Sequence, residues 1–301
     1  MSDPLAEVIT LLRPRAVNSK VISGAGSWAV RYSEFGQPSF CTMLEGECVL
    51  AVDGQAPLTL LAGDFVLMPT TPGFTLSGLA PAAPVFIDPK LQPPPEGELR
   101  HGKRTGPPDA RMLGGYFAFD SPDAALMVSL LPSLLHMRGV ERLSLLVQLV
   151  AEESAAQRPG RDLVLARLVE VLLIEALRSA PDEGAPPGLL RAMADTRLAA
   201  AMRHMHGDPA RPWTVDELAK KAALSRSAFF VRFSRAVGQP PMEYLLAWRM
   251  AVAKDLLRRN DVALAEVAER VGYSSASTFS TAFSRHVGQA PGRYARQQQV
   301  S

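Results

Sequence analysis

The sequence predicts an α+β fold, with a small β-barrel near the N-terminus followed by helices. An all-α C-terminal domain of two helix-turn-helix units joined by a long helix comes after them. Three observations predict this: short apolar stretches between turn residues, two apolar patterns at helical spacing, and a repeat near the C-terminus. We therefore expect a first domain over residues 1–180, a linker over 181–192 and a second domain over 193–301.

The composition is that of a globular protein without a membrane segment. Of 301 residues, 47% are hydrophobic and 21% are charged. No stretch approaches 18 uninterrupted apolar residues, and residues 1–4 lack the features of a signal peptide. Two cysteines, Cys41 and Cys48, are too few for a disulfide framework, so we expect a reducing, cytoplasmic location and no membrane partner.

Charge is distributed unevenly along the chain. Residues 190–301 hold 17 basic and 9 acidic side chains, whereas residues 1–189 hold 15 basic and 21 acidic ones. A basic C-terminal part indicates binding to a polyanion such as nucleic acid. An uneven but merely solvated surface is the alternative.

The N-terminal part has the pattern of β-structure. Apolar stretches at 28–32, 48–52 and 65–68 are separated by turn residues, and Asp53-Gly54 suits a tight hairpin. Regularly spaced short strands predict a barrel or sandwich. Residues 91–110, rich in proline, glycine and charge, are expected to form a mobile loop.

Two helices are predicted next, separated by Pro159-Gly160. The second is apolar on nearly all sides, which suits both a domain core and a contact with a second chain. The residues that we assign to a dimer helix are Leu165, Leu168 and Leu172. Packing within their own domain is the alternative for this stripe.

An internal repeat occupies the last 90 residues. Residues 229–241 align with residues 279–291, and eight of the 13 positions are identical. The segments before the two copies also match, but with an offset one residue shorter. We therefore expect one extra residue in the second turn, around Ser274-Ser275.

Each copy has the pattern of a helix-turn-helix unit. In the second helix of each copy, Phe229 and Phe233, or Phe279 and Phe283, are spaced to face inward together. A serine suited to cap the helix precedes them and a glycine suited to end it follows. Between the copies, residues 242–259 predict a connecting helix of about 27 Å, so the two units can reach successive major grooves.

These segments resemble the DNA-binding domain of the AraC/XylS family over residues 195–296. The matching segments are Pro212–Val215, Ser225–Phe229, Val237–Leu245, Trp248–Met250, Glu266–Tyr273 and Gly288–Tyr294. The N-terminal part resembles the cupin-type sensor domain found in one branch of that family. Its matching segments are Asp3–Leu5, Leu11–Arg15, Leu44–Cys48 and Ala62–Asp64.

The helical geometry and the family motif together imply which residues contact DNA. The expected base-reading residues are Ser227, Phe230, Val231, Ser277, Thr278 and Thr281. The expected phosphate contacts are Arg226, Arg232, Arg235, Ser275, Arg285 and Arg293. The family often has arginine, which suits guanine, at the positions of Val231 and Thr281. Here Phe230 and Val231 suit thymine methyl groups instead, with partial burial as the alternative.

The barrel is expected to bind a small organic effector rather than a metal. The candidate pocket residues are Trp28, Tyr32, Phe40, Cys41, Met43, Met68 and Phe74, with plain barrel core as the alternative. Metal cupins need several histidines and a carboxylate near one another. The five histidines of the chain all lie outside the predicted strands, and Cys41 and Phe74 stand where related sensors often have histidine. The relative placement of Cys41 and Cys48 stays open because Gly46 interrupts their strand. A buried structural thiol is expected, with redox sensing as the alternative.

Taken together, the composition and the resemblance predict a cytoplasmic, sequence-specific transcription activator without a cofactor. Its expected partners are double-stranded promoter DNA, a small organic effector, RNA polymerase and a second copy of the chain. Two alternatives stay open: a regulator whose barrel only dimerises, and a cupin enzyme fused to a DNA-targeting module.

Overall fold

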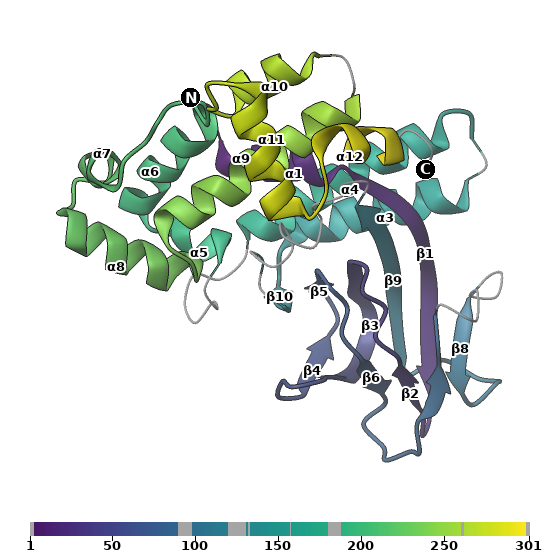
Figure 1. The fold of residues 1–301 in the computed structure, drawn as a ribbon. Helices are drawn as coiled ribbons and strands as arrows, with labels where there is room; N and C mark the ends of the chain where they lie inside the picture. The colour runs from purple at the N-terminus through teal and green to yellow at the C-terminus, as the bar shows by residue number, and fades with distance from the viewer. Residues whose placement is uncertain are drawn as a thin grey trace. The chain divides into compact units, whose positions relative to one another are not determined.

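Figure 1 shows the computed structural model, which describes residues 3–89, 98–119, 131, 133–156, 158–179, 188–259 and 262–298. The described elements form two compact units. One contains strands β1–β10 with α3 and α4, and the other contains α1 with α5–α12. The first part of the predicted linker, 181–187, lies outside the described residues.

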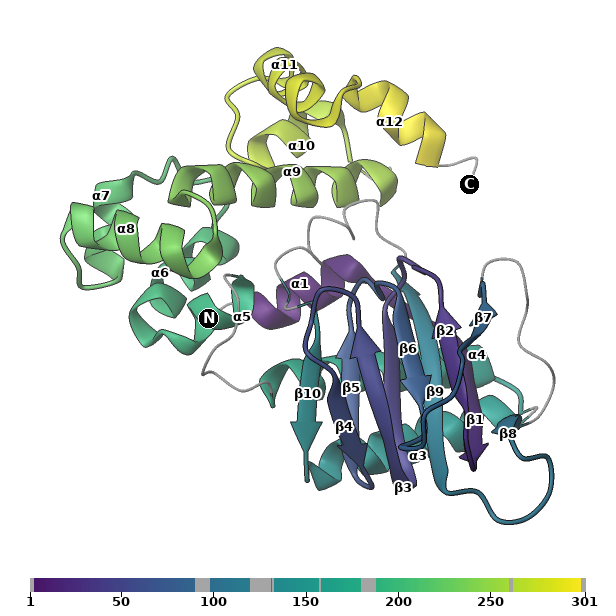
Figure 2. The ribbon, with the colours of Figure 1, turned by 90° about the horizontal axis from the view of Figure 1, so that it is seen from below.

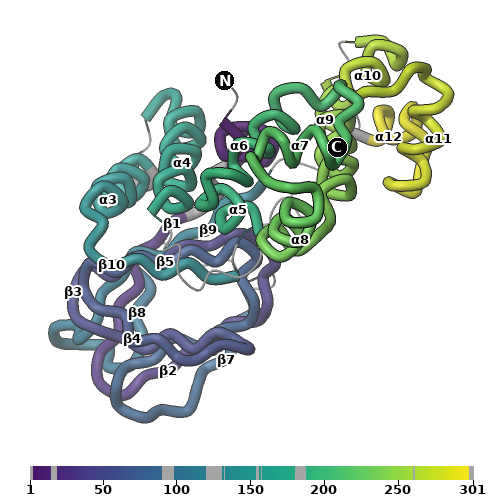
Figure 3. Tube along the Cα trace, turned by 90° about the vertical axis from the view of Figure 1, so that its left-hand side faces the viewer, coloured from purple at the N-terminus to yellow at the C-terminus, as the bar shows by residue number. Residues whose placement is uncertain are grey.

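The first unit is a mixed sheet that curls into a half-barrel. Its strands are β1 (Pro14–Ala25), β2 (Ala29–Tyr32), β3 (Ser39–Val52), β4 (Leu58–Leu61), β5 (Asp64–Met68), β6 (Phe74–Ser77), β7 (Val85–Ile87), β8 (Leu99–Gly102), β9 (Ala110–Phe119) and β10 (Leu135–Arg138). The first half of β3 pairs with β5 and β9, and its second half pairs with β4 and β6. Long β3 therefore joins the two layers of strands visible in Figure 3.

Two helices complete this unit. They are α3 (Glu141–Ala155) and α4 (Arg161–Arg178), which pack on each other and on β1 (Figure 2). The predicted break at Pro159-Gly160 is confirmed, since Gly160 lies directly before α4 with φ +80°. Arg142 Nε at the start of α3 lies 3.2 Å from Glu175 Oε2 near the end of α4. This ion pair indicates that the two helices run antiparallel.

The expected loop over 91–110 is wrong in part. Within it, residues 99–102 form β8, which pairs in parallel with the end of β1. Pairing with the edge of β1 gives the backbone N–H and C=O groups of β8 hydrogen-bond partners. The local sequence pattern does not reveal this pairing. The placement of histidines outside strands is also wrong for two of the five, because His101 lies in β8 and His136 in β10.

A bulge in β3 settles the placement of the two cysteines. The β3–β9 register shifts between Met43 and Glu45, and Gly46 has φ +71°. A Cβ on Gly46 would lie 1.9 Å from the Asp109 carbonyl oxygen, so only glycine fits. The shift reverses the alternation of side chains, so Cys41 and Cys48 both pack in the barrel interior.

A buried carboxylate ties β5 to β10. Asp64 is 1% exposed, and its carboxylate accepts hydrogen bonds from Arg138 Nε (2.8 Å) and Nη2 (2.9 Å) and from the Leu61 backbone N–H (3.0 Å). His136 Nε2 lies 3.0 Å from Oδ2. These contacts outweigh the effect of burial and lower the pKa of Asp64 to about 2.

The second unit is helical throughout its described part. Its helices are α1 (Pro4–Leu12), α5 (Leu189–Ala194), α6 (Thr196–Gly207), α7 (Val215–Lys221), α8 (Arg226–Val237), α9 (Pro241–Arg259), α10 (Leu264–Arg270), α11 (Ala276–Val287) and α12 (Pro291–Gln298). Helix α5 begins inside the predicted linker. The turn between α7 and α8 is one residue shorter than that between α10 and α11, as the repeat predicts. No helix in the described part of the chain is long and apolar enough to cross a bilayer.

Helix α1 packs on α6 and α9, far from it in sequence. Its apolar residues Leu5, Val8 and Ile9 are buried. Glu7 Oε2 lies 3.4 Å from Nδ1 of the buried His206, whose ring stacks on Trp248 with centroids 3.7 Å apart. The first helix of the chain thus forms part of the helical core.

Candidate DNA interface and barrel cavity

Each repeat copy begins its second helix with a serine cap. Ser225 Oγ accepts a hydrogen bond from the Ala228 N–H at 3.3 Å, and Ser275 Oγ accepts one from the Thr278 N–H at 3.2 Å. The Ser275 hydroxyl is also 2.9 Å from Thr278 Oγ1. Both helices end at glycines in the left-handed region, Gly238 and Gly288. The sequence signals for these boundaries are confirmed.

Phenylalanine pairs hold α8 and α11 in place. Phe229, Phe233, Phe279 and Phe283 are each 0% exposed, and Phe233 meets Tyr244 of α9 edge to face. The opposite faces of the two helices carry the six predicted base-reading residues. All six are exposed: Ser227, Phe230, Val231, Ser277, Thr278 and Thr281. Val231 is 65% exposed and Phe230 44%, so neither packs into the core.

The predicted phosphate contacts are also exposed, and they fall into two groups. In the first group, Arg226 Nη1 lies 3.4 Å from Asp216 Oδ2, and Arg232 Nε donates a hydrogen bond to the carboxylate of Asp195, the N-cap of α6. No carboxylate among the described residues pairs with the other three arginines, which are Arg235, Arg285 and Arg293. Ser275 is exposed as well, although its hydroxyl already caps α11.

A groove beside α8 was missed by sequence reasoning. It is lined by Ser227, Val231, Arg232 and Arg235 of α8 and by Arg191 and Asp195, from α5 and its end. The Gly188 N–H donates to the Ala236 carbonyl (2.8 Å), which fixes α5 against α8. The signal available in the sequence was the apolar pair Leu189-Leu190 directly after the proline-rich stretch.

The barrel contains an apolar cavity of about 300 Å³ that opens to solvent. Five of the seven predicted pocket residues line it, namely Tyr32, Phe40, Cys41, Met68 and Phe74. Tyr32 and Phe74 stack with ring centroids 4.8 Å apart. Burial raises the pKa of Tyr32 to about 12 and raises the pKa of the Cys41 thiol, so both groups stay neutral near pH 7.

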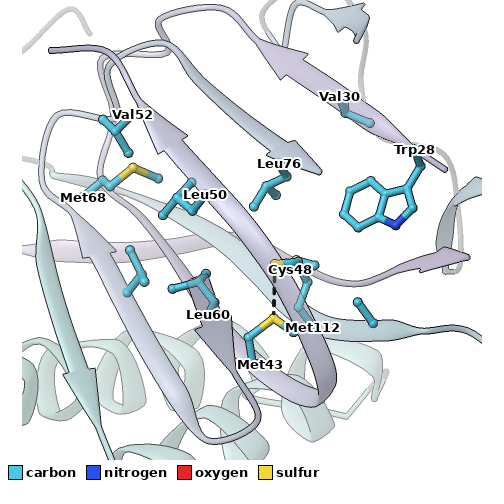
Figure 4. Packing of buried hydrophobic residues seen from close by; sticks show 12 residues of the cluster. Trp28, Val30, Met43, Cys48, Leu50, Val52, Leu60, Met68, Leu76 and Met112 are labelled. Atoms are coloured by element: carbon cyan, nitrogen blue, oxygen red, sulfur yellow. Dashed lines mark hydrogen bonds between the residues drawn. The ribbon is translucent and has the colours of Figure 1, made fainter. Parts of the chain in front are cut away.

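Trp28 and Met43 do not line this cavity. Both belong to the packed core cluster drawn in Figure 4, where Met43 Sδ lies 3.6 Å from Cys48 Sγ. Trp28 fills space left by Gly24 and stacks near His101, with ring centroids 5.9 Å apart. For these two residues the alternative of plain barrel core is the correct interpretation.

Other lining residues were not anticipated from the sequence. They include Lys20 and Ile22 of β1, Leu50 and Leu76, and Gly114, Gly115 and Tyr116 of β9. Two adjacent glycines inside a strand often mark space for a ligand or another backbone, and this signal was available. The described residues contain no group of three or more His, Cys, Asp or Glu that could hold a metal ion.

The predicted dimer helix is placed differently from the expectation. Leu165 and Leu172 are buried within their own unit, and Leu168 is half-buried. The exposed apolar residues of α3 and α4 are Leu145, Leu149, Leu163, Val164 and Val171. We call these five exposed side chains the outer strip of the helix pair.

Comparison with known families and proteins agrees with this architecture. The family described as Cupin matches residues 3–182, and the family described as Helix-turn-helix domain matches residues 218–297. Proteins named as AraC-like transcription regulators from Streptomyces lividans and Streptomyces antibioticus are 34% and 36% identical to the chain. The first alignment covers 97% of each chain, and the second covers 97% of this chain and 98% of its relative.

Part of the chain is also similar to solved structures. One of them is a transcriptional regulator with an AraC-type DNA-binding domain from Chromobacterium violaceum, at 24% identity and a TM-score of 0.33. The match covers 36% of this chain and 96% of the other.

Proposed function

Because the chain belongs to the family of AraC-like transcription regulators, we propose that it is a sequence-specific activator controlled by a small organic effector in the barrel. The observation that carries the DNA-binding role is the duplicated unit with two exposed helix faces, on α8 and α11. As an activator it would also contact RNA polymerase. An effector in the cavity would act by binding one arrangement of the protein better than another.

The two faces are suited to different readings of DNA. On α8, Phe230 and Val231 offer apolar contacts to thymine methyl groups. On α11, Ser277, Thr278 and Thr281 offer hydroxyl groups, although Thr281 Oγ1 already donates to the Ser277 carbonyl at 3.2 Å. The exposed arginines around them fix position on the phosphates rather than sequence.

The first test is binding of the purified protein to its own upstream DNA and to a scrambled duplex across a salt series. We expect tight, selective binding near 0.15 M salt that weakens steeply as salt rises. Arg285→Gln should reduce the slope of log affinity against log salt by about 1 on both duplexes. Arg178→Gln, an exposed arginine at the end of α4, is the matched control and should leave the slope unchanged. Absence of binding to either duplex, even at low salt, would contradict the proposal.

We further propose that two copies associate through the outer strip of α3 and α4. Leu145 is 61% exposed and Leu149 47%, one helical turn apart on the same face. Exposed leucines in such a strip are typical of an association surface.

Leu145→Asp is therefore expected to convert a dimer to a monomer, because a charge would be buried without a partner in the contact. Light scattering after size exclusion measures the mass directly. Leu79→Asp alters a leucine that is equally exposed, at 60%, but lies outside the helices, and should remain dimeric. A wild-type protein that is monomeric at micromolar concentration contradicts this part of the proposal.

A further inference from the structure

One row of residues across three strands lines the cavity. Lys20 of β1 pairs with Gly114 of β9, and Gly114 pairs with Cys41 of β3. Residues paired in this way point to the same face of a sheet, and neighbouring strands lie about 4.8 Å apart. All three residues line the cavity, so Lys20 and Cys41 face it from two sides of a position without a side chain.

Gly114 is the reason that there is space in this row. A Cβ at Gly114 would lie 3.0 Å from Ile22 Cδ1 and would meet few other atoms. One neighbouring row is filled: Met112, which pairs with Ile22, is 0% exposed. A larger side chain at position 114 would therefore occupy the volume that a ligand needs.

Lys20 is the one charged side chain among the described residues that line the cavity. No carboxylate in the described part of the chain forms an ion pair with it. Its neighbours in the cavity do not supply a negative charge either, because burial keeps the Cys41 thiol and the Tyr32 hydroxyl protonated. A positive charge beside apolar walls favours a negatively charged ligand group, since the interaction is stronger where water is excluded.

We propose that the cavity binds an apolar organic anion, with Lys20 paired to the carboxylate and the aromatic walls against the apolar body. The inference rests on the proposed effector role of the barrel and names the chemical class of the effector. The stacked pair Tyr32 and Phe74 and the edge-to-face pair Phe35 and Tyr116, with centroids 4.9 Å apart, present ring faces and edges to the ligand.

The test uses three probes that differ only in their polar group: 4-phenylbutyrate, 4-phenyl-1-butanol and 4-phenylbutylamine. Isothermal titration of the full-length protein should give an affinity for the acid at least tenfold higher than for the alcohol, and the lowest affinity for the amine. In Lys20→Met the affinity for the acid should fall to that for the alcohol, while the affinity for the alcohol stays unchanged. Lys103→Met, at an exposed lysine outside the cavity, should behave as the wild type.

Gly114→Val should abolish binding of the acid and the alcohol alike, and a thermal melt shows whether this variant is folded. If it is not, the comparison of Lys20→Met with Lys103→Met decides alone. Equal affinities for acid and alcohol, acid preference retained in Lys20→Met, or no binding of any probe would each overturn the inference. Selective promoter binding measured without any probe tests the regulator role separately, so the two failures are distinguishable.

Discussion

Phe233→Ala is expected to remove about 3–5 kcal/mol from the stability of the first helix-turn-helix unit, the usual cost of truncating a fully buried phenylalanine. Phe233 is 0% exposed and packs against Phe229, with centroids 5.4 Å apart, and against Tyr244. The empty space left by the missing ring would weaken the packing of α8 against α9. Selective binding to promoter DNA should be lost as a consequence.

Hydrogen exchange of the full-length chain, read peptide by peptide, measures this local loss of stability. A thermal melt of the whole protein would not, because it reports on the barrel unit and the helical unit together. Peptides from α7 and α8 should lose protection in Phe233→Ala, while peptides from α11, whose core contains Phe279 and Phe283, keep it. Phe230→Ala is the matched control on the same helix: it should keep full protection and weaken DNA binding only. Equal loss of protection in α8 and α11 would show that the two helix-turn-helix units do not have separate cores.

Asp64→Asn is expected to destabilise the barrel unit by about 2 kcal/mol, within the range for hydrogen bonds to charged groups. The amide keeps the size of the side chain but removes the charge and turns one acceptor into a donor that faces Arg138. The side chain of Arg138 is 59% exposed, so its guanidinium can be hydrated again, which limits the loss. Urea unfolding followed by exchange in β5 and β10 measures the change.

The same carboxylate makes a defined contribution to the pH dependence of stability. The pKa of Asp64 in the folded state, about 2, lies below its ordinary value of 3.8. Its stabilisation is therefore complete above about pH 4 and is lost as the pH falls towards about 2. Asp64→Asn should lack this component of acid unfolding. Asp53→Asn, which removes a carboxylate from the exposed pair with Arg31, should differ little from the wild type. An unchanged acid profile in Asp64→Asn would contradict the assignment.

Local patterns in the sequence were sufficient for the helical repeat. The i,i+4 phenylalanines, the serine caps and the terminal glycines all act within one or two turns of a helix, so spacing alone places them. The extra residue in the second turn followed from a change of offset between the copies. The exposed faces of α8 and α11 followed in turn from the buried ones.

The barrel was less accessible because its cavity depends on pairing between distant strands. Lys20 and Cys41 become neighbours only through Gly114, more than 70 residues further along the chain than Cys41. Strict alternation of side chains over the seven residues from Cys41 to Cys48 would place Cys48 on the opposite face of the sheet. The bulge at Gly46 instead turns Cys48 into the barrel interior. Strand β8 was missed because its sequence carries little apolar pattern and its stability comes from the edge of β1.

The position of α1 in the helical unit has a consequence for synthesis of the chain. This nine-residue helix is made before the barrel, but its packing partners α6 and α9 begin only at Thr196 and Pro241, after the barrel. A helix of this length is unstable alone in water, so Leu5, Val8 and Ile9 stay without their native contacts while the whole barrel is made. The helical unit therefore reaches its complete core only after the segments before and after the barrel meet, which makes it a late-folding part with contacts of long sequence separation.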